Sequence, residues 1–293
     1  MKKSGFVTII GRPNVGKSTI LNSIIGEKIA IVSPRPQTTR NSITGILNTD
    51  DAQMIFLDTP GYHKSRSKLG EYMVNQINDS LVSTDVILFV CEPLLEVREI
   101  EKEMLANYVG KKVILVINKI DTTNSSELAK SITAYSQAFD FTAVVPISAL
   151  KDSDVSIVIS EVLKLLPEGP MYFPEDMITD QPEKVIMAEI LREKALRLLS
   201  DEVPHGIAIV IERYKERENS DIIDIDATIF CEKDSHKGII IGKNGDTLKK
   251  IASNARFEME RFLDCKINLK CWVKVKSDWR NNEFMLRNFG FGR

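Results

Sequence analysis

The residues from Gly11 to Ser18 form a motif whose chemistry follows from their types and spacing. They read G-R-P-N-V-G-K-S and fit the pattern G-x-x-x-x-G-K-[ST], between an apolar run expected to be a strand and a segment expected to be a helix. Glycines let backbone N–H groups close around phosphate oxygens, and a helix N-terminus adds a favourable dipole. We expect Lys17 to reach the β- and γ-phosphates and the Ser18 hydroxyl to ligate Mg²⁺. The motif predicts nucleotide binding without choosing the base.

A second motif, D-T-P-G at residues 58–61, follows the apolar run 53–57. Asp58 would stand at the carboxyl end of a strand, where open α/β sheets bind their ligands. We expect Asp58 to hold Mg²⁺ through water and the Gly61 N–H to face the γ-phosphate. D-x-x-G alone is a common turn, but its position directly after the next predicted strand indicates a role in the same nucleotide site.

A third motif, N-K-I-D at residues 118–121, chooses the base. The carboxylate of Asp121 can accept hydrogen bonds from N1–H and from the exocyclic amine of guanine, whereas adenine offers neither donor in that arrangement. A site built on such a pair rejects the analogue that lacks it by roughly 10⁴-fold or more. The sequence therefore predicts GTP rather than ATP, with Ser148 and Ala149 adding a backbone contact at the base edge.

The elements that must position these motifs alternate between strand and helix. The expected strands of the first part are short apolar runs at 6–10, 53–57, 86–91, 113–117 and 143–147. Because such runs indicate a sheet buried on both faces, we predict a doubly wound, mostly parallel α/β domain over residues 1–166. Residues 167–182 contain four prolines and a glycine, which predicts an interdomain linker.

The pattern changes in residues 183–293, where we predict a smaller α+β domain with a C-terminal tail. Runs at 223–231 and 267–275 alternate apolar and polar residues, so their sheet should be covered on one face only. The expected order is helix, strand, strand, helix, helix, strand. Between the last two helices lies G-K-N-G, residues 242–245, preceded by three isoleucines.

Composition bounds the class of protein. At 293 residues, two domains are the default expectation, and 43% hydrophobic with 27% charged residues is ordinary for a globular chain. Residues 233–293 carry 14 Lys or Arg against 7 Asp or Glu, which favours a polyanionic partner. The four cysteines show no C-x-x-C spacing, so neither zinc nor a disulfide framework is expected. No signal peptide or membrane-spanning run is expected, which predicts a cytoplasmic protein.

Taken in order, the three motifs resemble those of translation-factor-type GTPases, and the string G-R-P-N-V-G-K-S-T is similar to the Era-like branch. That resemblance implies a first switch at residues 37–40, with Thr38 or Thr39 completing the magnesium shell. It also implies that Asn14 helps to bind K⁺. Ras-type GTPases carry a water-positioning glutamine after the second motif, where this chain has Tyr62, so slow intrinsic hydrolysis is expected.

The second domain looks like a prokaryotic-type KH domain, whose G-x-x-G loop clamps single-stranded nucleic acid. A GTPase domain followed by a KH domain resembles the Era family of ribosome-assembly GTPases over nearly the whole chain. The resemblance implies binding to the 3′ end of small-subunit ribosomal RNA during 30S maturation, by a monomer. Leu150 stands where the family's last nucleotide motif frequently has an acidic residue or lysine.

The expected site residues follow from these motifs. The catalytic group comprises Lys17, Thr38, Thr39 and Gly61. The nucleotide contacts are Gly11, Asn14, Val15, Gly16, Lys17, Ser18, Thr19, Asp58, Gly61, Asn118, Lys119, Asp121, Ser148, Ala149 and Leu150. The magnesium ligands are Ser18, Thr38 or Thr39, and Asp58. The RNA contacts are Ile239, Ile241, Gly242, Lys243, Asn244 and Gly245.

Two other functions compete with a GTP-driven RNA-binding switch. A metabolic phosphotransferase would need an acceptor-binding insertion, and none is visible in the first domain. A membrane-associated GTPase would use the basic C-terminal region on anionic lipid at the inner face of the cell membrane. The lysines and Trp272 on the polar face of 266–276 are expected to be a solvated edge-strand face.

Overall fold

The computed structural model describes residues 2–33, 35, 38–62 and 67–292. The chain divides into two compact units. The first comprises residues 1–30, 39–64 and 73–180, and the second comprises 31–38, 65–72 and 181–293. None of the described helices is long and apolar enough to cross a bilayer.

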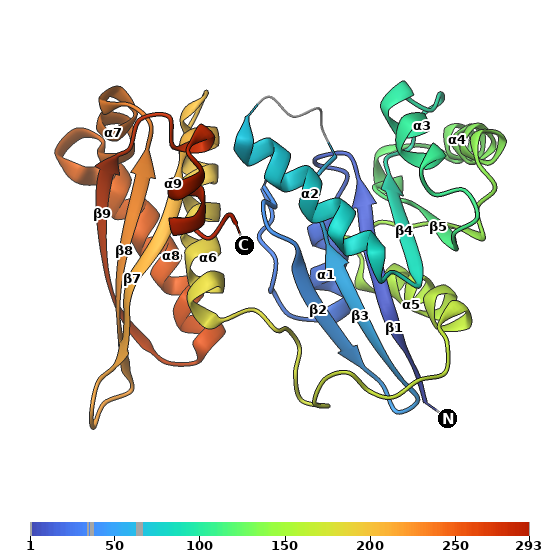
Figure 1. Ribbon diagram of the computed structural model, residues 1–293, viewed down its shortest axis with the longest axis horizontal. Coiled ribbons are helices and arrows are strands. Elements are labelled where there is room, and N and C mark those ends of the chain that lie inside the picture. Colours follow the sequence, from blue (N-terminus) through green and yellow to red (C-terminus); the bar gives the residue numbers. More distant parts are fainter. Residues whose placement is uncertain (1, 34, 36–37, 63–66, 293) are drawn as a thin grey trace. The chain divides into compact units, whose positions relative to one another are not determined.

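The first unit is a sheet of six strands in the order β2-β3-β1-β4-β5-β6 (Figure 1). Every neighbouring pair is parallel except β2 with β3, which is antiparallel. Five of these strands were predicted, and the short antiparallel edge strand β2 was not. The strands are β1 (Lys3–Gly11), β2 (Ile43–Asn48), β3 (Ala52–Asp58), β4 (Val86–Cys91), β5 (Val113–Ile117) and β6 (Ala143–Pro146).

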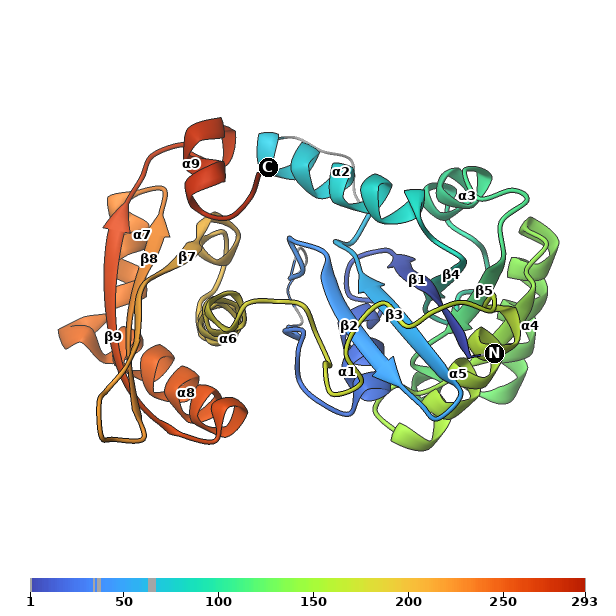
Figure 2. The same ribbon diagram turned by 60° about the horizontal axis from the view of Figure 1, so that its bottom comes forward.

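Helices cover both faces of this sheet because its strands are apolar on both sides. The helices are α1 (Lys17–Ile25), α2 (Lys68–Val82), α3 (Glu99–Ala106), α4 (Ser125–Ala138) and α5 (Asp152–Leu165). Leu88 and Val90 pack with α1 and α5, whereas Ile87 and Phe89 pack with α2, α3 and α4. Figure 2 shows α1 and α2 on opposite sides of the sheet. The burial on two faces agrees with the expected doubly wound domain.

Residues 167–180, expected as linker, lie along the first unit. Ser4 Oγ donates a hydrogen bond to the carbonyl of Pro170 at 2.6 Å, and Gln53 Oε1 accepts one from the Phe173 N–H at 2.9 Å. The Ile46 N–H donates to the Ile178 carbonyl at 2.8 Å, which occupies part of the free edge of β2. The division between units falls after residue 180, so the placement of the linker at 167–182 stays a prediction.

The second unit contains a three-stranded sheet in the order β7-β8-β9, with β7–β8 antiparallel and β8–β9 parallel. Its elements are α6 (Glu183–Leu198), β7 (Ala208–Glu216), β8 (Ile222–Cys231), α7 (Asp234–Ile241), α8 (Asp246–Leu263), β9 (Lys266–Val275) and α9 (Glu283–Asn288). The order up to β9 is the predicted one. A single apolar cluster joins α6 and α8 to one face of the sheet, as the alternating strands indicated.

The C-terminal tail of this unit is folded. Trp279 is buried and its Nε1 donates a hydrogen bond to the Gly206 carbonyl at 2.9 Å. The ring of Phe289, directly after α9, stacks on Phe230 with centroids 4.5 Å apart. A buried indole with a satisfied N–H fixes the tail against the outer side of the sheet.

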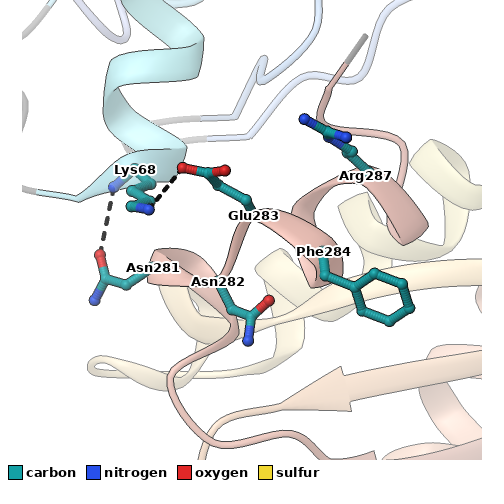
Figure 3. Close-up of a pocket in the computed structure, with 6 residues that line it drawn as sticks. All are labelled: Lys68, Asn281, Asn282, Glu283, Phe284 and Arg287. Carbon is teal, nitrogen blue, oxygen red and sulfur yellow. Dashed lines mark hydrogen bonds and ion pairs between the residues drawn. The ribbon is translucent and has the colours of Figure 1, made fainter.

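The second unit also includes two segments from earlier in the chain. From α6, Arg197 donates to the Val32 carbonyl at 3.1 Å and Arg192 donates to the Thr38 carbonyl. Figure 3 shows a pocket at the start of α2, where Lys68 Nζ lies 2.7 Å from Glu283 Oε1. The carbonyls of Val32 and Thr38 are therefore each held by a cationic side chain of α6.

Candidate nucleotide site and G-x-x-G loop

The turn from β1 into α1 is shaped by Gly16. Its φ of 101° lies in the left-handed region, and a Cβ there would stand 2.1 Å from Asn118 Nδ2. Only glycine fits this approach. Asn118 Nδ2 donates to the Val15 carbonyl at 2.8 Å, and Asn118 Oδ1 accepts from the Ala149 N–H at 3.0 Å. Asn118 thus ties together the phosphate-binding loop and the loop expected at the base edge.

Lys17 begins α1 and is buried, as a lysine that serves phosphates should be. Its Nζ donates to the carbonyls of Gly11 at 3.2 Å and Arg12 at 3.1 Å. Burial lowers the pKa of Lys17 to about 8, although the nearby Asp58 carboxylate opposes this shift. Thr19 follows in the first turn of the same helix. The ammonium is therefore held at the loop but loses its proton far more readily than an exposed lysine.

This pKa makes nucleotide binding sensitive to pH. Below pH 8 the free protein already carries the Lys17 proton, but above pH 8 it must take one up to meet the phosphates. We expect GTP affinity to fall roughly tenfold between pH 7.5 and 9, with uptake of nearly one proton at the upper end. Titration calorimetry in two buffers of different ionisation enthalpy measures that uptake. Guanosine, which has the base without phosphates, controls for titration of guanine, and an equal fall for guanosine would contradict the role of Lys17.

The expected magnesium ligands meet at one point. Ser18 Oγ lies 2.6 Å from Asp58 Oδ2 and 3.0 Å from Thr39 Oγ1, and Thr39 Oγ1 lies 3.3 Å from Asp58 Oδ2. The Thr38 hydroxyl instead donates to the Arg35 carbonyl at 2.7 Å. The two adjacent threonines therefore face different surroundings, and Thr39 is the one beside Ser18 and Asp58. Gln37, the first residue of the expected switch, lies outside the described residues.

The charge at this point fits a cation. Asp58 is fully buried, and its Oδ1 makes no hydrogen bond within the described part of the chain. Burial raises the pKa of Asp58, while the Lys17 ammonium lowers it. A buried carboxylate oxygen without a donor costs free energy, and oxygen ligands of this kind are those that Mg²⁺ prefers. The residues present therefore suit a magnesium ion.

The segment after Asp58 returns to the phosphate-binding loop. The Tyr62 N–H donates to the Gly11 carbonyl at 3.2 Å, and Thr59 Oγ1 donates to the Ile9 carbonyl at 2.8 Å. Gly61 lies between them and is buried. Its backbone is therefore close to the loop in which the phosphates are expected.

The residues for the base lie at the carboxyl ends of β5 and β6. Ser148 Oγ donates to Asp121 Oδ1 at 2.6 Å, and this hydrogen bond is the main cause that lowers the pKa of Asp121. The Asp121 carboxylate is exposed, and Leu150 is 81% exposed beside this loop. Lys119 Nζ donates to the Asn14 carbonyl at 2.7 Å. An ionised, accessible carboxylate is what recognition of two guanine donors requires.

The G-x-x-G loop joins α7 to α8 in the second unit. Gly242 has a φ of 74°, and a Cβ there would stand 2.2 Å from Thr247 Oγ1, so glycine is required. Lys243 and Asn244 are exposed at the tip of the loop. Gly245 ends it, directly before α8. The loop thus presents the Lys243 ammonium and the backbone between Gly242 and Gly245 to solvent.

The isoleucines before the loop differ in their roles. Ile240 is fully buried in the core, whereas Ile239 is 49% exposed and Ile241 is half-buried. The lysines of β9 are exposed on an edge strand, as expected. Trp272 is 44% exposed among them. Ile239 and Ile241 therefore supply apolar surface next to the loop.

Comparison with known proteins places both units. A family model described as 50S ribosome-binding GTPase matches residues 6–119, and a KH domain model matches residues 202–280. The GTPase Era of Clostridium beijerinckii is 54% identical over 293 residues, covering 99% of this chain and 98% of that protein. The chain belongs to the Era family of GTPases. The GTPase Era of Clostridium perfringens is 52% identical over the same length, with 99% of each chain covered.

Two solved Era structures match the whole chain at 41% identity. A single-residue variant of Era from Aquifex aeolicus bound to GDP and AlF₄⁻ has a TM-score of 0.95, covering 99% of this chain and 100% of that one. Era in complex with MgGDPNP and nucleotides 1506–1542 of 16S ribosomal RNA has a TM-score of 0.94, with 100% of both chains covered. The predicted fold class and the predicted Era family are thereby confirmed.

Three charged residues to which the sequence analysis gave no role contribute to the site. Arg12, Glu92 and Glu101 form a charged network next to the phosphate-binding loop. Arg12 stands inside the first motif, but its partners are distant in sequence. The sequence shows Glu101 as an acidic residue in the first turn of a helix, but nothing in the sequence indicates that its partner is Arg12.

Proposed function

We propose that this chain is a GTP-hydrolysing switch that binds RNA and assists maturation of the small ribosomal subunit. The observation that carries this proposal is a guanine-nucleotide site and a G-x-x-G helix pair in one chain of the Era family. The Era relative bound to MgGDPNP and to nucleotides 1506–1542 of 16S ribosomal RNA supports both ligands. The RNA proposed for this chain is the single-stranded 3′ end of small-subunit ribosomal RNA.

In this proposal the nucleotide site works by charge and position. Lys17 would meet the β- and γ-phosphates, and the Gly61 N–H would face the γ-phosphate. Ser18, Thr39 and, through water, Asp58 would hold Mg²⁺, which would supply neutralisation of phosphate charge. Because Tyr62 cannot orient water as a glutamine does, slow intrinsic hydrolysis is expected. We also propose K⁺ near Asn14, for which turnover should be faster in potassium than in sodium buffer.

The choice between the two threonines can be tested by substitution. We expect Thr39→Ala to reduce hydrolysis by about tenfold or more and to weaken GTP binding more than GDP binding, because a magnesium ligand of the triphosphate state is lost. We expect Thr38→Ala to stay within about twofold, since its hydroxyl donates to the Arg35 carbonyl. Phosphate release and nucleotide affinity at fixed Mg²⁺ measure this. The reverse ranking would give the ligand role to Thr38.

The same segment supports coupling between nucleotide and RNA. Thr39 stands beside the proposed magnesium ligands, and the preceding residues 31–38 belong to the second unit. Arg192, buried on α6, donates to the carbonyl of Thr38. A change in the position of Thr39 as a magnesium ligand would therefore shift the Thr38 backbone, whose carbonyl accepts from Arg192 on α6. We propose that the triphosphate state sets the RNA affinity through this segment.

RNA binding with and without nucleotide tests the proposed switch. Fluorescence anisotropy of a short labelled RNA from the 3′ end of 16S ribosomal RNA should show tighter binding with a GTP analogue than with GDP. Equal RNA affinity with GDP and with the GTP analogue would contradict the proposed switch. Absence of RNA binding in both states would contradict the proposed RNA function. A scrambled RNA of equal length is the control for charge alone.

Two features of the proposal concern where the protein acts. We propose a cytoplasmic monomer, with peripheral contact to the inner face of the cell membrane through the basic C-terminal region. Seven more basic than acidic side chains in residues 233–293 favour anionic lipid as well as RNA. Co-sedimentation with phosphatidylglycerol vesicles against phosphatidylcholine vesicles tests this contact.

A further inference from the structure

A buried ion pair holds the phosphate-binding loop from a helix that carries none of the nucleotide motifs. Arg12 Nε donates to Glu101 Oε1 at 2.9 Å. The Glu101 side chain, on α3, is fully buried, and the Arg12 side chain is 12% exposed. An arginine in this position is committed to the protein interior rather than to the nucleotide.

The Glu101 carboxylate is itself fixed from two further sides. The Tyr135 hydroxyl on α4 donates to Oε2 at 3.1 Å, and the Arg98 N–H donates to Oε2 at 3.2 Å. Tyr135 is fully buried, and burial raises its pKa, so its hydroxyl keeps the proton that it donates. With three donors on one carboxylate, the position of Glu101 is set by α3 and α4, and it dictates the position of Arg12.

A second carboxylate connects this pair to the guanine motif. Glu92, directly after β4, has Oε2 3.7 Å from Arg12 Nη2 and Oε1 2.5 Å from Lys119 Nζ. Lys119 Nζ also donates to the carbonyl of Asn14 in the phosphate-binding loop. Arg12 Nη2 makes no hydrogen bond to any residue that the structure describes. Glu92 therefore lies within ion-pair distance of both Arg12 and Lys119. If the Arg12–Glu101 ion pair is lost, the Arg12 guanidinium can move toward Glu92.

We propose that Glu101 is a positioning residue for guanine-nucleotide binding, acting through Arg12 on the phosphate-binding loop and through Glu92 on Lys119. The inference rests on the proposed nucleotide function. Loss of the Glu101 charge leaves a buried guanidinium without its partner, which is costly, and Glu92 is the nearest replacement. If Glu92 moves toward Arg12, Lys119 loses its ion pair with Glu92. The phosphate-binding loop and the guanine motif then both lose their preformed geometry. Binding must then order the loop, which weakens affinity.

The substitution Glu101→Gln tests this, because glutamine keeps the shape and removes the charge. We expect GDP and GTP affinities to fall alike by about tenfold, since both ligands use the same loop, with faster release of a fluorescent GDP in stopped flow. The matched control is Glu99→Gln, on the same helix but with an 82% exposed side chain paired to Lys102. It should stay within about twofold of the parent chain.

A double-mutant cycle with Arg12→Gln separates positioning from a general loss of stability. If Glu101 acts through Arg12, the second substitution should weaken GDP binding less than about twofold in the background of the first. Additive losses, or a folded Glu101→Gln protein with unchanged affinity, would overturn the proposal. If Glu101→Gln does not fold, Arg12→Gln alone carries the test, with the same tenfold loss expected and unchanged affinity overturning it. Failure of the parent chain to bind guanine nucleotides would instead remove the proposed function.

Discussion

Asp121→Asn is expected to lower GTP affinity by about 10³-fold and to give the protein a preference for xanthosine triphosphate. A hydrogen bond from guanine to the carboxylate contributes about 1.5–3 kcal/mol. Asparagine keeps an oxygen that can accept from N1–H, but its NH₂ group meets the exocyclic amine donor to donor, so one hydrogen bond is lost and a repulsive contact replaces it. Xanthine carries a carbonyl where guanine carries its exocyclic amine, so the amide donor finds an acceptor there. The fold should persist, because the amide oxygen can still accept the hydrogen bond from Ser148.

Titration of GTP and xanthosine triphosphate into the parent and the variant measures this exchange. Asp140→Asn is the matched control, because Asp140 is also an exposed aspartate in the first unit and belongs to none of the motifs. It should bind GTP like the parent chain. Unchanged GTP affinity in Asp121→Asn would mean that the base lies elsewhere.

Replacing the tip of the G-x-x-G loop, Lys243→Asp with Asn244→Asp, is expected to weaken RNA binding by about 100-fold and to leave GTP affinity unchanged. Two carboxylates would stand where the proposed RNA phosphates approach the backbone. Both side chains are exposed, and Asn244 has a φ of 53°, which aspartate tolerates. The loss should therefore arise from charge and not from unfolding.

The β7–β8 hairpin offers a control with the same chemistry. Lys215→Asp with Asn219→Asp makes the same change of charge at exposed residues, and Asn219 has a φ of 60°. Anisotropy with the 3′-end RNA should show near-parental affinity for this pair. If both double variants lose RNA binding equally, the RNA is held by net charge and not by the G-x-x-G loop.

The sequence predicted the parts of the fold whose signal is local. Short apolar runs mark β1, β3, β4, β5 and β6, and strict alternation marks β8 and β9. The strand β2 escaped prediction because I-T-G-I-L-N is short and contains a glycine, and its pairing depends on β3. The helix α9 has six residues, too few for a periodicity to show, and it is held by aromatic contacts of the tail.

The site shows the same limit at the level of single side chains. Spacing located the two threonines but cannot tell neighbouring residues apart. The Thr38 hydroxyl donates to the local Arg35 carbonyl, whereas the Thr39 hydroxyl meets Asp58 through a tertiary contact. Glu101 illustrates the second case. Its partner Arg12 is far away along the chain, and a glutamate in the first turn of a helix is ordinarily explained by the helix dipole. The charged network therefore became visible only in the folded chain.

Guanine recognition by Asp121 underlies every function proposed for this chain, and a thermal-shift comparison of GTP with ATP tests it most directly. With Mg²⁺ and nucleotide at about 1 mM, GTP and GDP should raise the melting temperature by about 5 °C or more, while ATP leaves it unchanged. Equal protection by ATP would contradict the assignment of this carboxylate to the base and, with it, the identification of a guanine-specific switch.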